Sequence, residues 1–136
     1  MTPLELMIAR HEGLELKPYK DLVGLITIGY GRCLDRKGIT KEEAYYLLKN
    51  DIKECQAQLE SNLPWFNQLD DWRQFALIDM CFNLGISGLF KFHNMLTALE
   101  MKDWSRAHNE ALNSAWARQV GSRAVEIANI LLTGEI

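Results

Sequence analysis

The sequence has too little of several features that would place it in other classes of protein. Three cysteines among 136 residues are too few and too scattered for a disulfide scaffold, and none forms the C-x-x-C spacing of zinc or redox sites. No apolar run is long enough for a membrane span, and charges at Glu5, Arg10 and Glu12 interrupt the N-terminal apolar stretch. We therefore expect reduced thiols, no signal peptide and no membrane insertion.

An excess of charge of one sign is also missing. The net charge is -3, which argues against a nucleic-acid partner because such partners require clustered Lys and Arg. A hydrophobic content of 48% with 24% charged residues excludes disordered and collagen-like chains. The length fits one ordinary domain, so we expect a folded monomer.

Two capping boxes predict the starts of two helices. The first is Thr2-Pro3-Leu4-Glu5, which also places proline at the first helical position, and Gly13 is expected to end that helix. The second is Thr40-Lys41-Glu42-Glu43. The apolar face that follows it continues to about residue 59, and the helix should stop before Pro64.

Between these helices the pattern changes to that of a small sheet. Pro18, Gly24, Gly29 and Gly31 interrupt this segment, and Leu25–Ile28 is apolar and rich in β-branched residues. The pattern predicts a small antiparallel β unit that turns near Gly24.

From Asp70 onward the sequence is helical in character. One helix is expected to end at Gly85, and further helices are expected near 93–101, 103–113 and 122–133. Asp103 and Ser122 are predicted as N-caps, and Gly121 and Gly134 as helix ends. The fold class is therefore α+β and mostly helical, with a small β lobe, a long connecting helix and a helical bundle.

Two carboxylates and a hydroxyl could lie close together in the first part of this chain. Glu12 ends the first helix, and Asp21 and Thr27 lie in the β unit. Glycoside hydrolysis uses two carboxyl groups, one that donates a proton and one that stays ionised, and a hydroxyl can position a water. From spacing alone, Glu12 and Asp21 could equally be solvated surface residues, and Thr27 an ordinary strand residue.

Several short motifs follow one another in a recognisable order and spacing. The first part carries His11-Glu12-Gly13-Leu14, Tyr19-Lys20-Asp21, Gly24, Thr27-Ile28-Gly29-Tyr30-Gly31 and Gly38-Ile39-Thr40-Lys41-Glu42-Glu43-Ala44. The rest carries Ala76-Leu77-Ile78-Asp79-Met80, Phe82-Asn83, Gly85, Trp104, Ser114, Trp116, Arg123-Ala124 and Thr133-Gly134. Together they closely resemble the phage-type lysozymes, glycoside hydrolase family 24, over nearly the whole chain.

This resemblance implies a muramidase with a two-lobed fold. Such an enzyme hydrolyses the β-1,4 bond between N-acetylmuramic acid and N-acetylglucosamine in peptidoglycan. By resemblance, Glu12 is the general acid, Asp21 activates water and Thr27 positions it. The implied organisation is a single lysozyme-like domain over 1–136, in which a β lobe spans about 14–39, a helix at about 40–59 joins the lobes, and 1–13 with 60–136 form the helical lobe.

The resemblance also implies residues that bind the glycan. Phe82 and Asn83 would line the cleft from the bundle side, Cys33 would occupy an apolar cleft position, and Arg123 would pair with Glu12 from across the cleft. The plainer alternatives are a core role for Phe82, a small buried hydrophobe at Cys33, and a surface arginine at the start of a helix for Arg123.

Two departures from the family pattern lead to further expectations. Arg32 replaces the usual histidine after Gly31, and we expect it to pair with Asp51 on the long helix. Only seven residues separate Gly31 from Ile39, so the small lobe should be trimmed to little more than a hairpin and make fewer sugar contacts.

Taken together, we expect an enzyme of phage or prophage host lysis that acts on peptidoglycan glycan strands. No metal is expected, because the three histidines lack zinc-like spacing, and no cofactor is expected. Without a signal peptide, the protein would be made in the host cytoplasm and would reach the wall through a separate pore. The alternative is a weak or inactive lysozyme-like module that binds peptidoglycan or serves as a scaffold.

Overall fold

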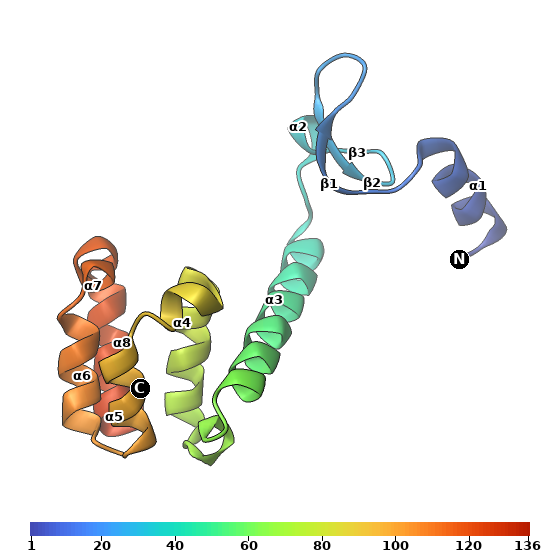
Figure 1. Ribbon diagram of the computed structural model, residues 1–136. Helices are drawn as coiled ribbons and strands as arrows, with labels where there is room; N and C mark the ends of the chain where they lie inside the picture. The colour runs from blue at the N-terminus through green and yellow to red at the C-terminus, as the bar shows by residue number, and fades with distance from the viewer. The chain divides into compact units, whose positions relative to one another are not determined.

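A computed structural model describes residues 1–136, which form two compact units, Met1–Leu47 and Leu48–Ile136. The first unit contains a small sheet together with helices, and the second is entirely helical (Figure 1). This confirms the α+β, mostly helical fold class. The assignment of residues 1–13 to the helical lobe stays a prediction.

The first helix, α1 (Pro3–Glu12), begins and ends where the sequence predicts. The Thr2 hydroxyl accepts a hydrogen bond from the Glu5 backbone N–H at 3.1 Å, which satisfies one of the unpaired donors of the first turn. Gly13 follows the helix at φ 74°, and its N–H donates to the Ala9 carbonyl. Glu12 is therefore the last residue of α1.

The small sheet has three antiparallel strands in the order β1 (Glu15–Lys20), β2 (Ile26–Gly29) and β3 (Arg32–Cys33). In this register Thr27 lies opposite Tyr19 on one side and opposite Cys33 on the other. A one-turn helix, α2 (Leu34–Lys37), follows β3. The lobe is more than the expected hairpin, because it holds a third strand and a helical turn that the sequence pattern did not reveal.

The long helix α3 (Lys41–Asn62) begins at the second capping box. The Thr40 hydroxyl accepts from the Glu43 N–H at 3.1 Å, and the Glu43 carboxylate accepts from the Thr40 N–H at 2.8 Å. The helix ends at Asn62, before Pro64 as predicted, and continues three residues beyond the apolar face that ends at about 59.

The prediction that Arg32 pairs with Asp51 is wrong. Both terminal nitrogens of Arg32 contact the Glu43 carboxylate at 2.9 Å, and one of them also donates to the Gly38 carbonyl at 3.1 Å. Glu43 lies two helical turns before Asp51, and the short loop from β3 to α3 brings Arg32 to the beginning of the helix. The arginine therefore fastens the sheet to the N-terminus of α3.

This ion pair makes a contribution to stability that depends on pH. Hydrogen bonds from Arg32 and from the Thr40 backbone lower the pKa of Glu43 from its ordinary 4.5 to about 2. The contribution should be complete above pH 4.5, and should be lost as the pH falls toward 2, because only the folded state holds the carboxylate ionised there. Melting temperatures of the wild type and of Glu43→Gln should differ at pH 7 and converge near pH 2.

Glu42→Gln is the matched control, because Glu42 is in the same turn of α3 and forms no ion pair. A difference between wild type and Glu43→Gln that stays constant from pH 7 to pH 2 would contradict the assignment.

The helical unit begins with the second part of α3 and continues through one 3-10 turn and five helices. These are η1 (Phe66–Gln68), α4 (Asp71–Leu89), α5 (His93–Glu100), α6 (Trp104–Leu112), α7 (Ala115–Val120) and α8 (Ser122–Thr133). Asp70 and Asp103 cap α4 and α6 through their side chains, as is typical of aspartate N-caps. The bounds of α5, α6 and α8 agree with the predicted ranges to within one residue.

Three details of this unit differ from the predictions. Helix α7 was not predicted, and the Ser114 hydroxyl begins it by accepting from the Ala117 N–H. Ser122 is the first residue of α8 and not its cap, since Gly121 occupies the N-cap position at φ 61°. Gly85 interrupts α4 as predicted, since the backbone leaves helical geometry there at φ 74° and ψ 162°, but a further helical turn that was not predicted extends to Leu89.

The buried core lies in this unit. Its fully buried larger side chains are Leu59, Phe66, Leu77, Met80, Leu89, Met95, Leu99 and Leu131. No single helix is long and apolar enough to cross a membrane; α4 and α5 meet the requirement only as a pair bent by 116°. Cys55 and Cys81 are also buried, and burial raises the pKa of the Cys81 thiol to about 12, as expected for a reduced core thiol.

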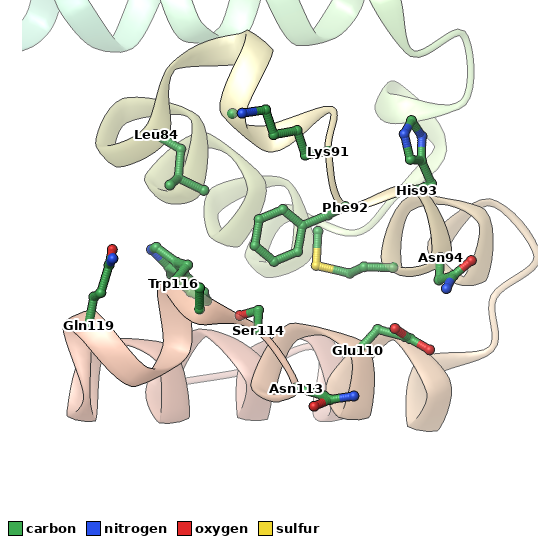
Figure 2. A pocket seen from close by; sticks show the side chains of 13 residues that line it. Leu84, Lys91, Phe92, His93, Asn94, Glu110, Asn113, Ser114, Trp116 and Gln119 are labelled. Atoms are coloured by element: carbon green, nitrogen blue, oxygen red, sulfur yellow. The ribbon is translucent and has the colours of Figure 1, made fainter.

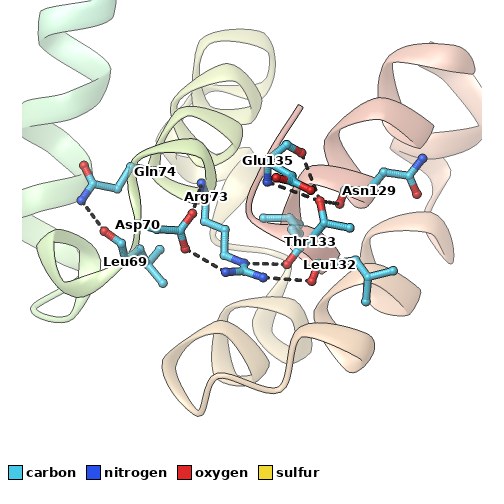
Figure 3. A network of polar contacts seen from close by, with 9 residues as sticks. Leu69, Asp70, Arg73, Gln74, Asn129, Leu132, Thr133 and Glu135 are labelled. Atoms are coloured by element: carbon cyan, nitrogen blue, oxygen red, sulfur yellow. Dashed lines mark hydrogen bonds and ion pairs between the residues drawn. The ribbon is translucent and has the colours of Figure 1, made fainter.

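Arg73 on α4 is the one buried charged residue, and it ties α4 to the end of α8 (Figure 3). Its guanidinium donates to the carbonyls of Leu131 and Leu132 at 2.8 and 2.9 Å and to the Asp70 carboxylate at 2.8 Å. It also stacks 3.7 Å from the centre of the Trp104 ring. The carbonyls of Leu131 and Leu132 belong to the last turn of α8, where the helix has no further N–H group to donate to them.

Candidate functional site

The Glu12 side chain lies against the backbone of Gly31, in the turn between β2 and β3. A Cβ atom built on Gly31 would be 2.6 Å from Glu12 Oε2 and 3.0 Å from its Cδ. Gly31 has a φ of 76°, a backbone conformation that residues with a Cβ atom rarely adopt. The absence of a side chain at this position therefore lets the carboxyl at the end of α1 approach the sheet.

Asp21 occupies the turn between β1 and β2 and binds the backbone of that turn. Its Oδ1 accepts hydrogen bonds from the N–H groups of Val23 and Leu25, both at 2.9 Å, and its own N–H donates to the Leu25 carbonyl. Its Oδ2 accepts no hydrogen bond from the protein. One oxygen thus fixes the carboxylate, and the other remains available.

Thr27 is buried, with 4% of its surface exposed, in the middle of β2. Its hydroxyl donates to the Leu25 carbonyl at 3.1 Å, the same carbonyl that accepts from the Asp21 N–H. Because the hydroxyl proton is used in this bond, the lone pairs of Oγ1 remain free to accept. Asp21 and Thr27 are thereby joined through one peptide group.

The structure therefore brings Glu12, Asp21 and Thr27 onto the same small unit. Asp21 and Thr27 are joined through Leu25, and Glu12 approaches the turn that follows the strand of Thr27. Such an arrangement offers two carboxyl groups and a fixed hydroxyl oxygen. These are the groups that acid and base catalysis of glycoside hydrolysis requires.

Cys33 lies on β3 directly opposite Thr27 and is half-buried. It is neither fully enclosed in a core nor fully exposed. Its place opposite Thr27 in the sheet puts a small side chain beside that residue, and its role as an apolar cleft residue stays a prediction.

Two of the predicted binding residues, Phe82 and Asn83, are neighbours on α4. Phe82 is 44% exposed, so it lies outside the core of the helical unit. The Asn83 side-chain oxygen accepts a hydrogen bond from the Trp116 indole N–H at 2.7 Å. Since indole nitrogen can only donate, this bond identifies the oxygen of the amide and leaves its NH₂ group free to donate.

Trp116 on α7 is buried in the helical unit. Its ring also packs edge-on against Phe92 at 6.0 Å. Its role in orienting Asn83 was missed, because the two residues are 33 positions apart and no sequence pattern links them.

A cavity of about 510 Å³ adjoins Trp116 on the α5 to α7 side (Figure 2). The polar side chains around it include Lys91, His93, Asn94 and Glu110. The helical unit thus offers a mixed polar and aromatic recess next to the residue that holds Asn83.

Arg123 on α8 pairs with Asp79 on α4. Its Nη2 lies 2.8 Å from Asp79 Oδ1 and its Nε 2.9 Å from the same oxygen. Both residues border a groove of about 480 Å³ that also includes Phe82. The sequence did not predict this partner, and the pairing of Arg123 with Glu12 stays a prediction.

Comparisons with known proteins show which family this chain resembles. The family described as phage lysozyme matches residues 9–129. The chain is 28% identical to a probable T4-type lysozyme 1 of Dictyostelium discoideum, over 96% of this chain and 94% of that protein. It is 32% identical to an endolysin of Acyrthosiphon pisum secondary endosymbiont phage 1, over 86% of this chain and 80% of that protein.

A third relative is much longer than this chain. The chain is 32% identical, over 96% of its own length, to the pre-baseplate central spike protein Gp5 of Enterobacteria phage T4, but it spans only 28% of that protein. The alignment of this chain with the Dictyostelium discoideum lysozyme covers 159 positions, more than the 136 residues of this chain. The Dictyostelium lysozyme therefore contains residues that have no counterpart here. The match from residue 9 to residue 129 includes the turn of Asp21 and the helix of Asn83, and the chain therefore belongs to the phage lysozyme family, a family of glycoside hydrolases.

Proposed function

We propose that this protein is a muramidase that hydrolyses the β-1,4 bond between N-acetylmuramic acid and N-acetylglucosamine in bacterial peptidoglycan. The observation that carries this proposal is the joining of Asp21 and Thr27 through Leu25, with Glu12 held against Gly31, in a member of the phage lysozyme family.

In this proposal Glu12 is the general acid. It donates its proton to the glycosidic oxygen as the bond to the sugar carbon breaks. Asp21 accepts a proton from the attacking water through Oδ2, the oxygen that the backbone leaves available. The Oγ1 lone pairs of Thr27 accept a hydrogen bond from that water and orient it toward the sugar.

The remaining predicted residues would contact the glycan. The NH₂ group of Asn83 can donate to an N-acetyl carbonyl or a hydroxyl, and Trp116 holds it in orientation. The exposed ring of Phe82 offers an apolar surface for a sugar face, and Cys33 a small apolar contact beside Thr27. Arg123 would add a charged donor from α8.

Lysis of purified cell walls tests this proposal. The wild type should release soluble fragments, and Glu12→Gln should slow release by roughly 10²- to 10⁴-fold, the usual range for a general acid. Glu15→Gln is the matched control: Glu15 lies in the same unit, and its side chain forms no hydrogen bond or ion pair. Fragment release by Glu12→Gln at the wild-type rate would rule out the assigned acid.

A binding module with little turnover is the second candidate, and the short β lobe favours it because it offers fewer sugar contacts. Sedimentation with intact walls separates the two functions. Wild-type protein that sediments with walls but releases no fragments would establish the module, whereas release together with sedimentation would establish the enzyme. Release of wall fragments during infection would place the enzyme in phage or prophage host lysis.

A further inference from the structure

The N–H group of Ile26, at the beginning of β2, donates to a side chain and not to a strand. Its acceptor is Asp35 Oδ2, at 2.7 Å, on the one-turn helix α2. A carboxylate acceptor at this distance forms a charge-assisted hydrogen bond, which is stronger than a bond between two neutral groups.

The register of the sheet explains why this acceptor is needed. On the β3 side, Thr27 pairs with Cys33 and Ile28 with Arg32, so that Leu34 would be the next partner, opposite Ile26. The chain leaves the sheet at Leu34 to form α2. The Asp35 carboxylate therefore replaces the backbone acceptor that a longer β3 would supply.

Ile26 lies between the two residues that join the candidate catalytic groups. Leu25 precedes it, donating its N–H to Asp21 and accepting at its carbonyl from Asp21 and Thr27. Thr27 follows it. A shift of the peptide at Ile26 would move the anchor of Asp21 and the hydroxyl of Thr27 together. On the β1 side Ile26 is paired with Lys20, but on the β3 side only Thr27 and Ile28 are paired, so Asp35 supplies the restraint on Ile26 from that side.

We propose that Asp35 is a positioning residue for the hydrolysis: its carboxylate fixes the peptide of Ile26 and so sets where Asp21 and Thr27 hold the attacking water. This inference rests on the proposed function. Asp35 does not touch the reacting atoms in this scheme, and it acts only through the backbone of β2.

Asp35→Ala and Asp35→Asn test the inference, with Glu15→Gln as a control for the loss of one negative charge in the same unit. Asp35→Ala removes the acceptor and should lower kcat for wall hydrolysis by about tenfold or more, with little change in KM, because a misplaced water slows the chemical step. Asp35→Asn keeps an oxygen acceptor and should therefore lower kcat less than Asp35→Ala does. Rates are measured below the melting temperature of each variant, so that unfolding does not enter.

Amide exchange followed by NMR gives a readout that needs no activity. In Asp35→Ala the Ile26 N–H should exchange at least tenfold faster than in the wild type, and the signals of Leu25 and Thr27 should shift, while those of the helical unit stay in place. Two results for Asp35→Ala would overturn the inference. One is an Ile26 N–H that exchanges as slowly as in the wild type, and the other is faster exchange of that N–H together with an unchanged kcat. If the wild type does not hydrolyse walls, the proposed function fails and the positioning role fails with it, even where the exchange result confirms the hydrogen bond.

Discussion

Replacing Gly31 by alanine is expected to remove most of the wall-hydrolysing activity and to lower stability only modestly. The new methyl group would lie 2.6 Å from Glu12 Oε2, far inside contact distance. Because the atoms it meets belong to the end of a flexible side chain, Glu12 can rotate away at little cost in free energy. The carboxyl would then leave its position, and a misplacement of about 1 Å can reduce a rate roughly 100-fold.

Gly29→Ala is a matched control for this substitution. Gly29 also has a positive φ, 69°, but nothing lies within 4 Å of a Cβ built there. Both variants should therefore carry similar backbone strain, of about 1–2 kcal/mol, and only Gly31→Ala should displace Glu12. Initial rates of fragment release and thermal melting separate the two effects. Equal rates for the two variants would show that contact with Gly31 does not place the Glu12 carboxyl.

Replacing Arg73 by alanine is expected to cause a large loss of stability in the helical unit. The substitution removes the donors for the Leu131 and Leu132 carbonyls and the partner of Asp70, and it takes a cation away from the C-terminal end of α8. Breaking a buried charge network of this kind lowers the free energy of unfolding by about 3–5 kcal/mol. The Asp70 side chain is 40% exposed and can be hydrated once Arg73 is gone, so we expect a loss of about 3 kcal/mol, at the lower end of this range.

Urea unfolding followed by circular dichroism at 222 nm measures this loss. Arg73→Lys should be intermediate, because an ammonium keeps the charge but cannot reach both carbonyls and Asp70 in the geometry of a guanidinium. Arg118→Ala is the control, since Arg118 is an α7 arginine that forms no ion pair. A loss below about 1 kcal/mol for Arg73→Ala would mean that water replaces the lost donors.

Sequence reasoning succeeded where the cause is local. The predicted caps at Thr2, Thr40 and Asp103 satisfy N–H groups within three residues of the cap, so the sequence itself contains both partners. The same holds for Gly13, whose N–H donates back to Ala9.

It failed where a short segment depends on a neighbour. β3 is two residues long and α2 four, and neither has a periodic pattern to recognise. β3 forms because β2 presents a free edge, and α2 follows because the chain must turn toward α3. Gly85 interrupts α4 as predicted, but the helical turn after it was not predicted; Leu89 in that turn is buried in the core, a contact that depends on the other helices.

The partners of charged and polar side chains could not be predicted from the sequence either. Arg32 pairs with Glu43 and not with Asp51, because the path of a short loop decides which turn of α3 it reaches. The pairs of Asn83 with Trp116 and of Arg123 with Asp79 join residues 33 and 44 positions apart. Such contacts depend on how helices pack, which no local pattern specifies.

By itself, the sequence determined the fold class, the caps of the main helices, the family resemblance and the candidate trio of Glu12, Asp21 and Thr27. Only the tertiary structure showed that Leu25 joins two members of that trio, that Gly31 makes room for the third and that Asp35 holds the strand between them. The physical reason is that residue types and helix caps are encoded within a few positions. The placement of a carboxyl to within an ångström depends on backbone groups that the folded chain brings together.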